Sequence, residues 1–225
     1  MAIKSMQELM LEELREIYSA ERLALRAYPR MRKAIRTQSL RDAVERHVEQ
    51  TKEQIGRLEQ MFELMDARTR AKTCRSMQGL LEEAQEHIDA DLSPELLEVM
   101  LVSDLQKIEH FEIAAYGSAK AHAQALGLQE AAKLLDQTLN EEKETDTILN
   151  QIATKEVNPQ AVGESEEAEE VIDTEEEKPR KRAAPSKSKG TSGGRQPVAA
   201  SPSKAGPRSR GAKNSSRGTG AQARS

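Results

Sequence analysis

Two glutamates three residues apart interrupt the apolar pattern of residues 107–117, KIEHFEIAAYG. On a helix, Glu109 and Glu112 lie one turn apart, so both carboxylates face the same side. The apolar residues around them at helical spacing place that side toward the protein interior. Burying two carboxylates is costly unless a cation compensates for the lost water. The spacing therefore indicates a pair of metal ligands.

The other expected helices also carry inward polar residues. Their apolar stripes include Glu21, His47, Glu142 and Asp146. Carboxylate oxygens with one imidazole and no thiolate favour iron or manganese over zinc. We therefore expect two metal ions, iron or alternatively manganese. The predicted ligands are Glu21, His47, Glu109, Glu112, Glu142 and Asp146, and the predicted neighbours of the metals are Tyr18, Gln50, Thr51, Gln54, Tyr116 and Thr145.

Each of these residues alone also permits an ordinary structural role. A glutamate on an apolar stripe often reaches solvent at a helix end or pairs with an arginine, and His47 alone suits a satisfied core histidine. The inward positions carry no Lys or Arg except Lys120. We therefore expect no cationic side chain to replace the metals.

Composition divides the 225 residues into three parts. Residues 164–177, ESEEAEEVIDTEEE, carry nine acids and no base, whereas residues 178–225 carry 13 Lys or Arg and no acid. The last part is rich in Gly, Ser and Pro and has almost nothing apolar larger than alanine, which is typical of a disordered segment. The predicted organisation is a helical domain at 1–158, an acidic linker at 159–177 and a disordered basic tail at 178–225.

The first part predicts an all-α domain of four long helices, because helix formers dominate it and aromatic residues are few. The expected helices run from Ser5 to about residue 37, from 39 to 65, from 94 to 127 and from 129 to 155. Pro29 should kink the first or end its straight part, and Pro159 lies beyond the last. A short fifth helix is expected in the long connection, within residues 76–89, crossing or covering one end. Short connections on either side of one long crossover favour a ferritin-like up-down four-helix bundle.

Several features bear on where the protein works. The single cysteine, Cys74, excludes an internal disulfide framework and suits a reducing compartment. The N-terminus lacks the apolar region of a secretory signal, and no stretch has the length and apolarity of a membrane span. We therefore expect a cytoplasmic protein with no membrane partner.

Four segments resemble the YciE/YciF family of bacterial ferritin-like stress proteins: IYSAERLALRAYPRM, HVEQTKEQIGRLEQMFELM, KIEHFEIAAYGSAKAHAQALGL and LLDQTLNEEKETD. The resemblance covers about residues 5–155. It implies a rubrerythrin-related bundle that forms a homodimer and acts as a ferroxidase, with O2 or peroxide as the small-molecule substrate.

The resemblance to ferritins and rubrerythrins also implies which residues bind metal. Glu21, Glu109, Glu112 and Glu142 match glutamate ligands of those proteins. The usual Glu-x-x-His pairs fall here on Thr51-x-x-Gln54 and Glu142-x-x-Thr145. His47 and Asp146 are therefore the expected substitutes for the displaced histidines.

The tail suggests a further partner. Basic residues without aromatic residues can bind phosphate backbones but cannot stack on bases, so we expect non-specific DNA binding. A solvated linker, or a tail that folds back on residues 164–177, is the alternative. The whole chain would then be either a di-metal oxidoreductase or a non-catalytic dimeric module tethered to DNA or to a protein partner. The first basic residues of the tail are Lys178, Arg180, Lys181, Arg182, Lys187 and Lys189.

Overall fold

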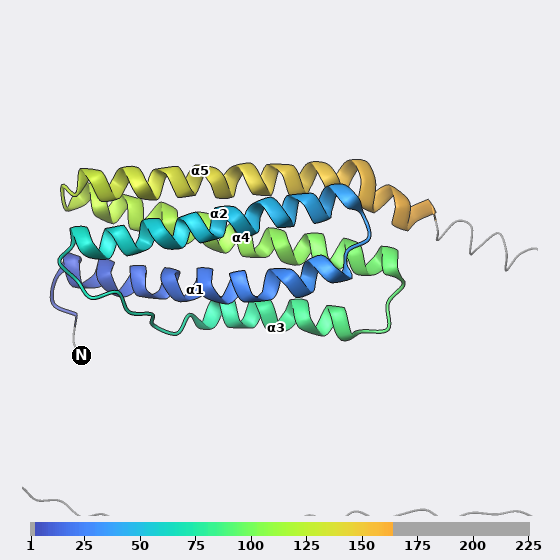
Figure 1. Cartoon of the computed structure of the whole chain (residues 1–225), viewed down its shortest axis with the longest axis horizontal. Coiled ribbons are helices and arrows are strands. Elements are labelled where there is room, and N and C mark those ends of the chain that lie inside the picture. The colour runs from blue at the N-terminus through green and yellow to red at the C-terminus, as the bar shows by residue number, and fades with distance from the viewer. Residues whose placement is uncertain (1–2, 164–225) are drawn as a thin grey trace, which may run out of the picture. The chain divides into compact units, whose positions relative to one another are not determined.

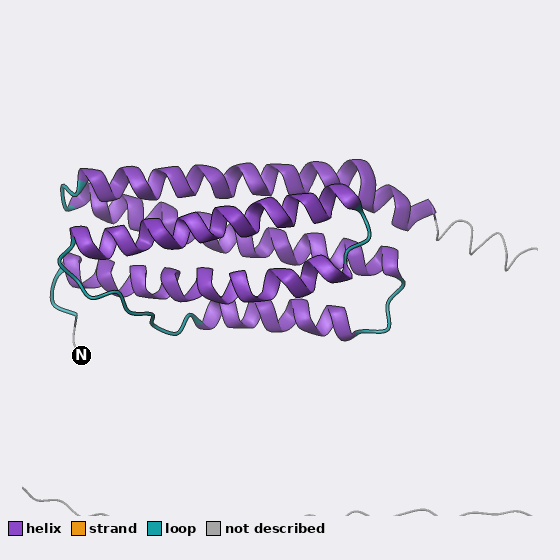
Figure 2. Cartoon of the chain, viewed as in Figure 1, coloured by secondary structure: helices purple, strands orange, loops and turns teal. Residues whose placement is uncertain are grey.

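The computed structural model describes residues 3–163, which form helices joined by loops (Figures 1 and 2). The predicted tail and residues 164–177 of the predicted linker lie outside the described residues. The elements are α1 (Met6–Ala34), α2 (Gln38–Leu64), α3 (Arg75–Asp89), α4 (Pro94–Ala125), α5 (Gln129–Ile152) and the π-helix η1 (Ala153–Val157).

Four long helices build the bundle. α1 packs against α2 and α4, and α5 packs against the same two helices. Short loops join α1 to α2 and α4 to α5, whereas the long crossover between α2 and α4 contains α3 (Figure 1). This confirms the predicted all-α, ferritin-like up-down fold. The fifth helix lies differently from the prediction, because α3 runs along the side of the bundle against α1 and α4. Its apolar residues Met77 and Ala84 are buried there.

Side chains cap the N-termini of two of the bundle helices. The Ser5 hydroxyl accepts a hydrogen bond from the Glu8 backbone N–H at 3.1 Å, and α1 begins one residue later. The Ser93 hydroxyl accepts from the Leu96 N–H at 3.3 Å, with Pro94 in the first turn of α4. Such caps satisfy N–H groups that have no partner inside the helix.

The cap of α2 comes from another helix. The Glu98 carboxylate of α4 accepts hydrogen bonds from the backbone N–H groups of Arg36 and Thr37 and from the Thr37 hydroxyl. Thr37, the N-cap residue of α2, makes no capping bond of its own. Glu98 is 3% exposed, so this buried acid is satisfied by three donors at a helix N-terminus.

Pro29 and Pro159 both lie within helical structure. α1 continues past Pro29 to Ala34, so this proline does not end the helix. Beyond α5, helical conformation continues through η1 and Pro159 to residue 163, further than the predicted end at 155. The π-helix η1 lies just before Pro159, and the Asn158 N–H donates a hydrogen bond to the Ala153 carbonyl. A π-type turn separates the proline ring from the preceding carbonyls with which it would clash in a regular helix.

The interior consists of two apolar clusters. One contains Tyr28, Leu40, Leu101 and Leu149, and the other contains Leu14, Phe62, Tyr116 and Leu135. Buried polar residues of all four bundle helices belong to neither cluster: Glu21, His47, Thr51, Gln54, Arg57, Glu98, Asp104, Glu109, Glu112, Thr138, Glu142 and Thr145.

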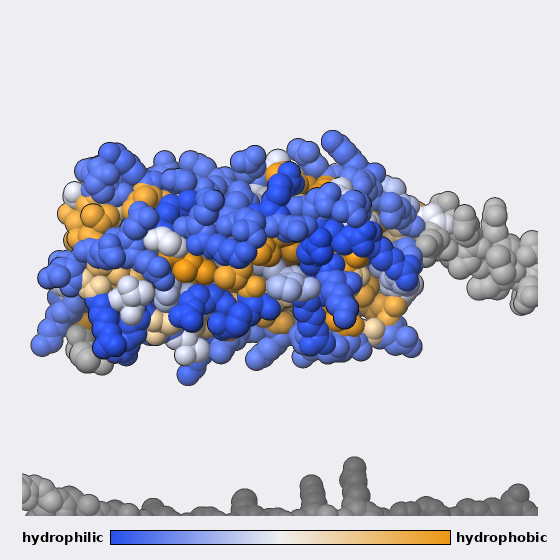
Figure 3. All heavy atoms as spheres, viewed as in Figure 1, coloured by the Kyte–Doolittle hydropathy of each residue, from blue (hydrophilic) through white to orange (hydrophobic). Residues whose placement is uncertain are grey.

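The outer surface of the bundle is largely hydrophilic on the face shown in Figure 3, with apolar atoms in the gaps between polar side chains. Among residues 3–163, none of the helices combines the length and the apolarity needed to cross a bilayer.

Candidate metal centre

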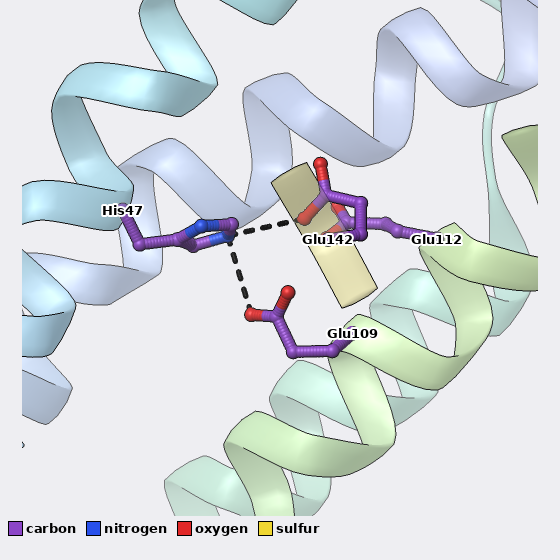
Figure 4. A group of neighbouring side chains, drawn as sticks. All are labelled: His47, Glu109, Glu112 and Glu142. Carbon is purple, nitrogen blue, oxygen red and sulfur yellow. Dashed lines mark ion pairs between the residues drawn. The ribbon is translucent and has the colours of Figure 1, made fainter. Parts of the chain in front are cut away.

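Four buried side chains from three helices meet inside the bundle (Figure 4). α2 contributes His47, α4 contributes Glu109 and Glu112, and α5 contributes Glu142. Each offers one ligand atom, and these atoms all lie within 4.8 Å of one another. The helix register explains this convergence, because each residue lies on the inward stripe of its helix. Four of the six predicted ligands are thus close enough to share an ion.

Most carboxylate oxygens in this group have no hydrogen-bond donor. Both oxygens of Glu109, both of Glu112 and Oε2 of Glu142 are buried without a hydrogen-bond partner. An unsatisfied buried acceptor costs about 1–3 kcal/mol, and more if it is charged. Buried polar groups in proteins are otherwise nearly always paired. Five such oxygens in one place fit a site that binds cations.

His47 presents a nitrogen lone pair to these oxygens. Its Nε2 lies 3.2 Å from Glu109 Oε1 and 3.8 Å from Glu142 Oε2 (dashed in Figure 4). On the other side of the ring, Nδ1 lies 3.3 Å from the Thr145 hydroxyl, which donates its hydrogen to the Glu141 carbonyl. That hydroxyl can therefore only accept from Nδ1–H. This assigns the ring hydrogen to Nδ1 and leaves the lone pair of Nε2 on the side of the cluster, where it can bind a metal.

Burial shifts the pKa of each group in the cluster. Loss of water lowers the pKa of His47 to about 4, although a hydrogen bond with Gln50 opposes the shift, so the ring is neutral near pH 7. Loss of water also raises the pKa of Glu142 to about 7, and the charge of Glu141 adds to this effect. Burial followed by the charge of Glu142 raises the pKa of Glu109 well above its usual value. Cations between these groups would reverse the shifts of the acids.

Glu21 lies beside this group and already has one donor. The Tyr116 hydroxyl donates a hydrogen bond to Glu21 Oε1 at 2.5 Å, and both residues are buried. Burial and the charge of Glu142 raise the pKa of Glu21, and burial and the charge of Glu21 raise that of Glu112. Glu21 is therefore an electrostatic neighbour of the cluster, and the role of Tyr116 as a neighbour of the metals stays a prediction.

Asp146 lies apart from the other predicted ligands. Its carboxylate is 23% exposed, lies 3.4 Å from His110 Nε2 and accepts a hydrogen bond from Gln106 at 3.2 Å. His110 is itself 66% exposed. The residue sits at the outer edge of α4 and α5, where these partners and solvent satisfy its charge.

Some of the predicted neighbours of the metals bond to residues of the cluster, and others do not. The Thr51 hydroxyl donates to the His47 carbonyl at 2.8 Å, and the Gln54 amide donates to Glu142 Oε1 at 2.5 Å. Tyr18 instead donates to Glu59 at 2.8 Å. Tyr18 also packs edge-on against Phe62 in the apolar cluster. Its hydroxyl therefore contacts α2 through Glu59 and is not bonded to the four side chains of the candidate site.

Two residues near the site were not assigned to it from the sequence. Tyr28 packs edge-on against the His47 ring, and its hydroxyl lies 3.1 Å from Nε2. It falls on the same stripe of α1 as Glu21, which is the signal that could have found it.

Arg57 is 7% exposed, pairs with Glu141 and donates to Thr138 at 2.9 Å. The expectation that inward positions lack arginine is therefore wrong at this residue. Its positive charge is matched by Glu141, however, and does not neutralise the cluster. Lys120, the basic residue expected to point inward, pairs with Asp136 at 2.5 Å.

An up-down helical bundle with unpartnered carboxylates and an imidazole at its centre defines a ferritin-like protein with a candidate metal site. Residues 5–162 match the family described as a domain of unknown function, DUF892. The chain belongs to this family.

The relatives agree with the predicted YciE/YciF resemblance. Protein YciF of Escherichia coli K12 is 37% identical over 162 residues, which are 72% of this chain and 98% of the relative. The crystal structure of the E. coli stress protein YciF aligns with a TM-score of 0.67 over 69% of this chain and 99% of that chain.

Two further solved structures are similar. YcfI of Rhodopseudomonas palustris is 35% identical with a TM-score of 0.65, over 66% of this chain and 94% of that one. A protein of Xanthomonas campestris is 22% identical with a TM-score of 0.57, over 72% and 99% of the two chains, which supports the fold alone.

Proposed function

We propose that the protein holds two divalent metal ions, iron or manganese, inside its bundle and reacts there with O2 or peroxide. The observation that carries this proposal is the set of five buried carboxylate oxygens without donors on Glu109, Glu112 and Glu142. A purely structural cluster of acids would have acquired donors, as Glu98 has in the same helix. Oxygen ligands with one imidazole suit iron and manganese.

The charges of the site favour two ions. Glu21, Glu109, Glu112 and Glu142 are buried carboxyl groups, and the buried Arg57 is paired with Glu141. His47 is neutral near pH 7 because burial lowers its pKa to about 4. Two divalent ions would balance four carboxylates, whereas one would leave two negative charges in a dry interior.

A small cavity beside the site limits what can react there. Its volume is about 10 Å³, and Tyr28, His47, Glu109 and Thr145 form its polar walls. Such a space suits one molecule about the size of water. An oxidant such as O2 or peroxide therefore fits this part of the site better than an organic substrate.

The chain would contribute placement and charge. When bound, a pair of reduced iron ions supplies the electrons that reduce the oxidant. Glu109, Glu112 and Glu142 would hold the ions, Thr145 keeps His47 in the tautomer that can bind, and Tyr116 orients Glu21. The apolar clusters on the two flanks exclude bulk water.

Elemental analysis of the protein purified without chelators tests this proposal. We expect about two iron or manganese ions per chain. The Glu109→Ala/Glu142→Ala double variant should lose them, and Asp104→Asn, a change at a buried acid of α4 that has partners, should keep them. Loaded wild-type protein should then consume O2 or peroxide.

Absence of metal in the wild-type protein after anaerobic loading with ferrous iron would overturn the proposal. Metal retained by the double variant would place the ions elsewhere and would also overturn it. Metal bound without any consumption of O2 or peroxide would overturn the catalytic part alone.

We propose a second activity for the tail, non-specific binding to DNA, because residues 178–225 carry 13 basic residues and no acid. Counterion release makes such binding steeply dependent on salt. Full-length protein should bind DNA of any sequence at low salt and lose it at high salt. A chain truncated before Lys178 should not bind, and retention by that chain would contradict the proposal. The homodimer implied by the family resemblance stays a prediction that sedimentation can test.

A further inference from the structure

Gln54 has an unexplained buried oxygen beside the candidate metal centre. The residue is 0% exposed, and its side-chain oxygen Oε1 is buried without a hydrogen-bond partner. The sequence predicts Gln54 as a neighbour of the metals, and the family resemblance places it where a Glu-x-x-His pair usually carries its histidine. An unpartnered amide oxygen in a dry interior nevertheless costs free energy unless a hydrogen-bond donor or a cation meets it.

The orientation of this amide is fixed by its nitrogen. Nε2 donates to Glu142 Oε1 at 2.5 Å and to Glu141 Oε2 at 3.2 Å. Arg57 also binds Glu141 Oε2, which holds that acceptor in place. Exchanging the nitrogen and oxygen of the amide would set Oε1 against two carboxylates. The donors and acceptors therefore determine which end of the amide is the oxygen.

Glu142 separates two ligand environments. Its Oε2 lies 3.8 Å from His47 Nε2, whereas its Oε1 accepts the hydrogen bond from Gln54 (Figure 4 shows Glu142 and His47). The two oxygens of one carboxylate thus face different partners. His47 and Glu109 lie toward one side, and Gln54 lies toward the other.

We propose that the amide oxygen of Gln54 is a ligand of the second metal ion, which makes the two ion positions chemically different. This inference rests on the proposed function. The ion near His47 and Glu109 has an imidazole ligand. An ion near Gln54 would have only oxygen ligands, from the Gln54 amide and from the carboxylates of the cluster.

The difference has a chemical consequence. Amide and carboxylate oxygens are hard ligands that suit Mn²⁺ and Fe²⁺. The ion position near Gln54 lacks the imidazole, which is the softest donor of the cluster. A neutral amide also adds a ligand without adding charge, so the four carboxylates still balance two divalent ions. A glutamate at this position would add a fifth negative charge but would keep the oxygen.

Titration of metal-free, full-length protein with Mn²⁺ tests the inference, with free Mn²⁺ measured by its electron paramagnetic resonance signal. Wild-type protein should bind two ions per chain. Gln54→Met, which keeps the length of the side chain without the oxygen, should bind one ion tightly and the second at least about tenfold more weakly. Gln54→Glu, which keeps an oxygen but loses the N–H donor, should bind two ions.

Gln137→Met is the matched control. Gln137 also donates to Glu141, at 3.2 Å, but from the exposed side of α5. This variant should bind two ions, and weak binding to the acidic residues 164–177 is common to all four proteins. Circular dichroism confirms that each variant is folded.

The outcomes separate the two proposals. Wild-type protein that binds no Mn²⁺ and no iron overturns the proposed function and this inference with it. Wild-type and Gln54→Met proteins that both bind two ions with equal affinity overturn the inference alone and leave the oxygen to a bound water. Loss of the second ion in Gln54→Glu would show that the N–H donor is what matters, and would also overturn it.

Discussion

Two pairs of buried acids on the same helix, α4, differ in one respect. Glu98 and Asp104 are 3% and 1% exposed, and Glu109 and Glu112 are 0% and 1% exposed. Glu98 caps α2, and Asp104 bonds to a histidine and a lysine, whereas Glu109 and Glu112 have no donors. Burial of a carboxylate therefore says little about function by itself. The absence of a partner is what distinguishes a candidate ligand from a structural acid.

The largest effect should come from a satisfied acid. Glu98→Ala leaves the N–H groups of Arg36 and Thr37 without their acceptor at the start of α2. We expect the free energy of unfolding to fall by about 4 kcal/mol in urea denaturation. Glu98→Gln keeps one acceptor oxygen and should lose about half as much. Metal content per folded chain should not change, and a loss of metal would remove the distinction between the two pairs.

Replacing Glu142, an acid of the candidate centre, should stabilise the metal-free protein, whereas replacing Glu98 destabilises it. An ordinary glutamate ionises near pH 4.5, but the pKa of Glu142 in the folded metal-free protein is raised to about 7. As pH rises between these values, Glu142 ionises first in the unfolded chain, so the folded state of the wild type loses stability. Glu142→Gln lacks this loss. The variant should be about 3 kcal/mol more stable than the wild type above pH 7 and nearly equal to it near pH 4.

His47 titrates in both of these metal-free proteins, so its contribution cancels in the comparison. The effect of pH on stability through His47 has the opposite sign. Because burial lowers the pKa of His47 to about 4, the folded state loses stability as pH falls below 6.5. Urea denaturation at several pH values measures the difference. A Glu142→Gln variant less stable than the wild type at every pH would show that burial of the ionised Glu142 carboxylate does not cost the folded state stability.

Asp104 tests a second group of potential ligands. Glu83, His87 and Asp104 could together hold an ion, but Lys107 already lies 3.2 Å from Asp104 and 2.8 Å from Glu83. The ammonium supplies the charge that a metal would otherwise bring. Asp104→Asn should therefore cost about 1.5 kcal/mol of unfolding free energy and leave the metal content unchanged. A loss of one ion would identify this group as a metal site.

The long helices could be predicted because their apolar residues recur at helical spacing over many turns. The same spacing places His47, Glu109, Glu112 and Glu142 on inward stripes, and this part of the site follows from the sequence. The position of α3 does not follow, because a short amphipathic helix can bury its apolar face against a side or an end of a bundle. The cap that Glu98 provides joins residues about sixty positions apart, which no local pattern shows.

Inward stripes also have edges, and the sequence does not fix how residues there orient. Arginine is usually exposed, so the residue type alone predicts an exposed side chain at position 57. Arg57 is buried instead, and its guanidinium pairs with Glu141. Asp146 is the reverse case. Thr145 already faces His47, and one residue further the helix has turned by about 100°. The carboxylate of Asp146 consequently meets Gln106 and His110 near the surface.

Asp146→Asn should therefore have the smallest effect of these changes. An ion pair with the exposed His110 is worth less than about 0.5 kcal/mol, so the unfolding free energy should hardly move. If Asp146 is a ligand, as the sequence predicts, Mn²⁺ binding to one position should weaken at least about tenfold. If its charge is satisfied at the edge of α5, both ions should bind as in the wild type. We expect the second result, because Asp146 already has the partners that Glu109 and Glu112 lack.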